Sequence, residues 1–166
     1  MFNGIERSIP VAEHPVTVIG IGNPYRGDDR VGLYVAEQVR NHALKGLSVV
    51  EGIGDGFALI DAWAESDLAI VIDCASSGST PGTTFRFDAV RETIPGNLFS
   101  GLSTHSISVN EAIDLARVLN RLPKELVVYG IEGENFSTGL DLAPVVEASA
   151  HKVVESILEE IETLTN

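Results

Sequence analysis

Residues 68–73 read LAIVID, an apolar run from Leu68 to Ile72 that ends in an aspartate. A run that is apolar at every position, rather than at alternate positions, predicts a strand that is covered on both faces. Strands of this kind belong to parallel sheets with a layer of helices on each side. The rest of the chain should therefore alternate between strands and helices.

The flanking sequence shows this alternation. Four further runs are expected to form strands: Thr17–Ile21, Leu47–Glu51, Leu126–Ile131 and, at the edge of the sheet in a direction left open, Thr83–Phe87. Helical spacing of apolar residues predicts four helices, at Val31–Leu44, Phe57–Ala64, Ser108–Asn120 and about Leu142–Leu164. The pattern predicts an α/β fold, a single doubly wound and mostly parallel sheet with helices on both faces.

Length and composition exclude several classes of protein. The 166 residues suit one α/β domain, with a leader segment at 1–15 and a core at about 16–164. A net charge of −13 argues against nucleic acid or an anionic membrane surface as a partner. No apolar run approaches the ~20 residues of a membrane span, and no targeting segment is recognised. The single cysteine, Cys74, excludes an internal disulfide, so we expect a cytoplasmic protein.

The loop after the first expected strand carries two adjacent acids. Residues 20–29 read GIGNPYRGDD, and Asp28 and Asp29 stand where a phosphate-binding loop needs Lys and Ser or Thr. Tyr25 likewise replaces the third glycine of a dinucleotide motif. Because carboxylates at a helix N-terminus would repel a phosphate, we expect a cation or a neutral polar ligand. Both acids could instead cap the following helix, although one cap uses only one side chain.

Two more polar residues are expected at the same edge of the sheet. Asp73 ends the apolar strand, where the carboxyl ends of parallel strands form a ligand-binding crevice, or it bonds the turn that follows. His105 precedes the helix that begins at the Ser108-x-x-Glu111 capping box. The positive end of that helix favours a neutral imidazole able to bind a metal, although a histidine bonded within its own loop is an equal alternative. Asp29, Asp73 and His105 could together hold zinc, nickel or a related divalent ion.

Several motifs resemble those of the hydrogenase maturation proteases, the endopeptidases that process the large subunit of nickel–iron hydrogenases. The specific motif is GIGNPYRGDDRVG at Gly20–Gly32. Weaker motifs extend the resemblance to nearly the whole chain: Val71–Ala75, Pro81–Thr83, Thr104–His105 and Tyr129–Glu132. The resemblance implies that Asp29, Asp73 and His105 are the metal-binding and catalytic residues. It also implies that they recognise nickel in the immature large subunit, whose C-terminal extension is then removed.

The resemblance and this set of side chains together predict a metal-dependent endopeptidase of hydrogenase maturation. We expect the hydrogenase large-subunit precursor as partner and nickel carried by that substrate, with zinc or another divalent ion able to substitute. The general base is open between Asp28, Glu51 and water bound to the metal. The alternative function is a non-catalytic metal-binding or precursor-binding chaperone on the same fold. A third hypothesis is a cysteine hydrolase that uses Cys74 and His105.

Overall fold

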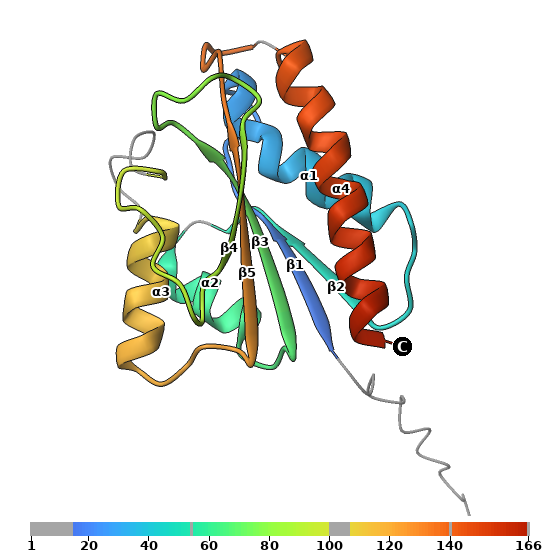
Figure 1. The fold of residues 1–166 in the computed structure, drawn as a ribbon, viewed down its shortest axis with the longest axis vertical. Coiled ribbons are helices and arrows are strands. Elements are labelled where there is room, and N and C mark those ends of the chain that lie inside the picture. Colours follow the sequence, from blue (N-terminus) through green and yellow to red (C-terminus); the bar gives the residue numbers. More distant parts are fainter. Residues whose placement is uncertain (1–14, 54, 100–106, 140, 166) are drawn as a thin grey trace, which may run out of the picture.

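The computed structural model describes residues 15–53, 55–99, 107–139 and 141–165, and its centre is one five-stranded sheet (Figure 1). The strand order is β2-β1-β3-β5-β4. The strands are β1 (Val16–Gly20), β2 (Leu47–Glu51), β3 (Leu68–Ala75), β4 (Thr84–Asp88) and β5 (Glu125–Glu132). All neighbouring pairs are parallel except β4 with β5, which decides the direction that the sequence left open. The predicted mostly parallel sheet is confirmed.

Helices cover both faces of this sheet, as the continuously apolar strand predicts. The four helices are α1 (Val31–Arg40), α2 (Gly56–Trp63), α3 (Val109–Val118) and α4 (Pro144–Thr165). α1 and α4 lie on one face, and α2 and α3 lie on the other (Figure 1). The doubly wound arrangement is therefore confirmed.

The central strand β3 is buried on both sides. Ile70 and Ile72 pack into the core beneath α1 and α4, while Ala69 and Val71 pack into the core beneath α2 and α3. None of the four is exposed, and full burial of an Ile or Val side chain contributes roughly 1.5–3 kcal/mol. This double burial holds β3 in the middle of the sheet and so places Asp73 at the carboxyl edge.

Two helices end at least two residues earlier than the apolar spacing predicts. α1 stops at Arg40 rather than Leu44, and Ala43 has a φ of +49°. α3 stops at Val118, and Asn120 has a φ of +54°. A residue in the left-handed region cannot continue a right-handed helix, so the backbone turns away while the apolar pattern continues.

The expected leader segment at 1–15 lies outside the described residues except for Pro15. The carbonyl of Pro15 accepts hydrogen bonds from the N–H groups of Asp67 (2.8 Å) and Leu68 (3.4 Å), just before β3. Within the described parts of the chain, no helix combines the length and the apolar character needed to cross a membrane.

Candidate active site

A short 3-10 helix, η1 (Gly27–Arg30), carries the two adjacent acids of the first loop. The N–H of Ile21 donates to the carbonyl of Ile72 (2.9 Å), which holds this loop against the end of β3. Gly22 has a φ of +148°, and a Cβ atom there would lie 1.9 Å from the carbonyl oxygen of Asp29. Only glycine allows the loop to wrap so closely around η1. The glycines of this loop therefore serve backbone packing next to Asp29.

Asp29 and Asp73 line one cavity at the carboxyl edge of the sheet. Asp29 is 9% exposed, and a carboxylate oxygen of Asp73 accepts the N–H of Cys74 (2.7 Å). The structure thus brings together two of the three residues that the sequence predicts for the site. Neither Asp28 nor Asp29 caps η1 or α1 through its side chain, so the capping interpretation is wrong.

The two acids are costly to ionise together in this environment. Burial is the main cause that raises the pKa of Asp73 to about 7; the N–H of Cys74 opposes this shift and the charge of Asp29 adds to it. Burial also raises the pKa of Asp29, while the positive charge of Arg26 and a backbone hydrogen bond from Asn23 oppose that shift. A cation placed beside both carboxylates would favour their ionised forms.

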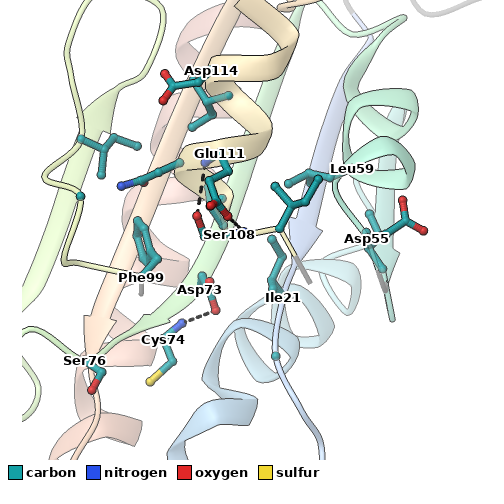
Figure 2. Close-up of a pocket in the computed structure, with 18 of the residues that line it drawn as sticks. Ile21, Asp55, Leu59, Asp73, Cys74, Ser76, Phe99, Ser108, Glu111 and Asp114 are labelled. Carbon is teal, nitrogen blue, oxygen red and sulfur yellow. Dashed lines mark hydrogen bonds between the residues drawn. The ribbon is translucent and has the colours of Figure 1, made fainter. Parts of the chain in front are cut away.

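The cavity that contains Asp29 and Asp73 has a volume of about 790 Å³. Figure 2 shows Asp73 at its base, with residues of α2 and α3 on its walls. Its charged lining comprises six carboxylates and one guanidinium in the described part of the chain: Asp29, Asp55, Asp73, Glu92, Glu111, Asp114 and Arg117. Uncharged residues complete the wall, both polar ones such as Ser76 and apolar ones such as Leu59 and Phe99. The surplus of negative charge favours a cation or a positively charged segment over an anionic ligand.

The remaining candidates of the sequence analysis have other surroundings. Asp28 is fully buried, is not part of the cavity lining, and accepts backbone N–H groups of the chain that follows β5. Glu51 pairs with Arg40 (3.0 Å) and lines a separate hollow of about 440 Å³ beside α1. His105 lies outside the described residues.

Two carboxylates that the sequence analysis did not assign to the site organise its loops. Glu132 is 3% exposed and accepts the N–H (2.9 Å) and the hydroxyl (2.8 Å) of Ser77 and the N–H of Gly78 (3.0 Å). It ties the loop after β3 to the end of β5. Asp55 caps α2 by accepting the N–H of Ala58 (2.8 Å) and also lines the cavity. Glu132 ends β5 and Asp55 follows β2, both at the carboxyl edge of the sheet, a position that could have drawn attention to them.

A metal centre is not complete within the described residues. Among them, no three His, Cys, Asp or Glu side chains are placed so that they could hold one ion. Asp29 and Asp73 supply two carboxylates in a shared cavity, and the predicted third ligand, His105, belongs to the part that is not described.

Comparisons with known proteins agree on one family. A family model described as hydrogenase maturation protease, HycI, matches residues 33–160. The hydrogenase expression/formation protein HupD of Thiocapsa roseopersicina is 27% identical over 148 residues, which cover 87% of this chain and 66% of HupD. The chain thus spans just under two thirds of the length of that relative.

Solved structures show the same fold. The hydrogenase maturating endopeptidase HybD from Escherichia coli superposes with a TM-score of 0.73 at 22% identity, over 90% of this chain and 93% of HybD. The [NiFe] hydrogenase maturation protease HybD from Thermococcus kodakarensis gives a TM-score of 0.60 at 27% identity, over 89% and 98% of the two chains.

Proposed function

The chain belongs to the hydrogenase maturation protease family, and we propose that it is a cytoplasmic endopeptidase that acts on the large-subunit precursor of a nickel–iron hydrogenase. In this proposal the enzyme removes the C-terminal extension of the precursor after nickel has been inserted. The precursor carries the nickel, which the enzyme recognises through Asp29, Asp73 and His105. Zinc or another divalent ion could take the place of nickel.

The observation that carries this proposal is the pair of acids, Asp29 and Asp73, in one cavity whose charged lining is mostly acidic. Burial raises the pKa of both carboxyl groups, and the charge of Asp29 raises that of Asp73 further. A divalent cation between them would offset the cost of holding two carboxylates away from bulk water. Carboxylate oxygens together with an imidazole nitrogen suit nickel and zinc, so this donor set fits the ion.

Binding and orientation are the tasks of the protein in this proposal. When bound, the ion would polarise the carbonyl of the scissile peptide bond. Asp29 and Asp73 would orient the precursor by holding its ion, and the cavity of about 790 Å³ has room for an extended segment. The two candidate bases already have partners: Asp28 accepts three backbone N–H groups, and Glu51 pairs with Arg40. We therefore assign the role of general base to neither.

The test compares nickel-loaded with nickel-free large-subunit precursor. We expect the purified chain to shorten only the nickel-loaded precursor, and Asp29→Ala to lower the rate at least about 100-fold, since even residues that merely support metal ligands matter 10- to 100-fold. Glu155→Ala, which removes an exposed carboxylate from α4, is the matched control and should keep the parental rate. Mass spectrometry of the precursor gives the readout.

Each alternative has its own result in this test. Equal cleavage of both precursors would reject recognition through the metal. A stable complex without any change in precursor mass would favour the chaperone instead. Unchanged cleavage by Asp29→Ala would remove Asp29 from the mechanism.

Cys74→Ala separates the proposed mechanism from a cysteine hydrolase. The Cys74 side chain is 4% exposed, and burial, together with the nearby charge of Asp73, raises the pKa of its thiol above the ordinary value. The reactive thiolate is therefore disfavoured. We expect Cys74→Ala to keep at least half of the parental cleavage rate and to lower the free energy of unfolding by about 1 kcal/mol. A folded variant that no longer cleaves would restore the cysteine hypothesis.

A further inference from the structure

The carboxylate of Asp28 is fully buried and bound by backbone donors only. One oxygen accepts the N–H groups of Glu134 (2.7 Å) and Asn135 (2.8 Å), and the other accepts the N–H of Ala143 (2.7 Å). The N–H of Asp28 in turn donates to the carbonyl of Asn135 (2.8 Å). Hydrogen bonds from neutral donors to a charged acceptor are short and roughly twice as strong as neutral ones. Asp28 is therefore the centre of a tight cluster.

This cluster joins η1 to two neighbouring stretches that lie more than 100 residues further along the chain. Asp28 belongs to η1, Glu134 and Asn135 follow directly after β5, and Ala143 precedes the first residue of α4. Gly27 strengthens the junction, because its φ is +50° and a Cβ atom there would lie 2.4 Å from the carbonyl oxygen of Asn135. Nothing larger than glycine fits between η1 and this segment without displacement.

Asp28 directly precedes Asp29 in η1. In a 3-10 helix there are three residues per turn, so consecutive side chains point about 120° apart. The Asp28 side chain is directed to the residues that follow β5, while Asp29 lines the cavity with Asp73. A turn held at Asp28 cannot rotate, and its orientation determines where the carboxylate of Asp29 points.

We propose that Asp28 is a positioning residue: its carboxylate anchors η1 to the chain after β5 and thereby holds Asp29 in the cavity. Two acceptor oxygens are essential to this role, because all three partners are donors and both oxygens of the side chain accept from them. An asparagine would turn an NH₂ group towards at least one of these N–H groups. The kinetic part of the proposal rests on the proposed function, in which Asp29 acts on the precursor.

The test uses the full chain with Asp28→Asn. The matched control is Ser66→Ala, which removes a buried hydrogen bond to Thr17 (2.7 Å) at the opposite end of the sheet. Two readouts are needed: amide hydrogen exchange, and kcat and KM for cleavage of the nickel-loaded precursor. Should Asp28→Asn not fold, Asp28→Ser retains one acceptor and replaces it.

We expect Asp28→Asn to speed amide hydrogen exchange at least about 10-fold at Glu134, Asn135 and Ala143. The same increase is expected at Asp29, whose N–H group donates to the carbonyl of Arg26 (3.0 Å) at the start of η1. We also expect kcat to fall roughly 10- to 100-fold with KM within about three-fold of the parental value. Ser66→Ala should change neither exchange at these amides nor kcat.

Three results would overturn the proposal. The first is unchanged amide exchange at Asp29 in Asp28→Asn, and the second is unchanged kcat in that variant. The third is a fall of kcat in Ser66→Ala as large as that in Asp28→Asn, because such a fall would reflect lower stability alone. If the parent chain cleaves no precursor, the proposed function fails, and exchange at Asp29 still decides whether Asp28 positions its neighbour.

Discussion

Asp73→Asn is expected to raise the free energy of unfolding by about 2–4 kcal/mol at pH 8 without divalent ions, and to abolish processing of the precursor. The gain arises because burial raises the pKa of Asp73 to about 7 from an ordinary 3.8. At pH 8 the folded chain holds an ionised carboxylate with little solvation, whereas the unfolded chain holds it in water. Asparagine has the same shape and can still accept the N–H of Cys74, but it carries no charge.

The gain in the free energy of unfolding of Asp73→Asn should increase as the pH rises. Below about pH 4 Asp73 is protonated in both states, so its charge has no effect on stability. Between about pH 4 and 7 the folded chain keeps a proton that the unfolded chain has released, so Asp73 lowers stability progressively as the pH rises. Above about pH 7 both states are ionised and the penalty is constant.

Urea unfolding of the parent and of Asp73→Asn from pH 5 to 8 measures this effect. The difference in the free energy of unfolding between the two chains should widen up to about pH 7 and then level off. Glu155→Gln, on the exposed side of α4, is the control and should follow the parent throughout. A difference that does not vary with pH would contradict the electrostatic explanation. In the processing assay, retention of more than about a tenth of the parental rate would show that the charge of Asp73 is dispensable.

Local patterns in the sequence predict most of the fold. The apolar run Leu68–Ile72 predicts a strand with helices on both faces, and the structure buries that strand on both sides. The capping box at Ser108 is present, with both of its hydrogen bonds to Glu111. These predictions succeed because burial and capping depend on residues that are near one another along the chain. Helix ends are less predictable, since a left-handed residue such as Asn120 stops α3 inside a continuing apolar pattern.

The candidate site depends on contacts that sequence spacing does not reveal. Two adjacent acids before a helix are typical of a cap, yet Asp28 binds N–H groups more than 100 residues away and Asp29 lines a cavity. Glu51 ends the second strand as expected, but its partner Arg40 is the last residue of α1. Asp73 could be placed because the carboxyl ends of parallel strands meet at one edge. Partners of the acids are chosen by tertiary packing, which no local pattern encodes.

Gly32→Ala is expected to lower the free energy of unfolding by about 3 kcal/mol or more, although alanine is the better helix former. Gly32 lies in the first turn of α1. A Cβ atom there would lie 2.2 Å from the carbonyl oxygen of Ile21 and 2.3 Å from that of Ile72. Both obstacles are backbone oxygens, one just after β1 and one within β3, so α1 would have to move away from the sheet. The gain of about 1 kcal/mol in helix propensity is smaller than this cost.

The same substitution should also impair the site, because η1 continues directly into α1 and carries Asp29. We expect processing to fall even at temperatures where the variant is fully folded. Gly96→Ala is the control for stability, because that glycine is exposed and a Cβ atom there would meet nothing within 4 Å, so its free energy of unfolding should stay within about 0.5 kcal/mol of the parent. Since Gly96 lines the cavity, Glu155→Ala is the control for processing. Urea unfolding and the precursor assay give both readouts. If Gly32→Ala were as stable and as active as the parent, close packing of α1 on the strands would contribute nothing to the position of Asp29, and the anchor at Asp28 would have to account for it alone.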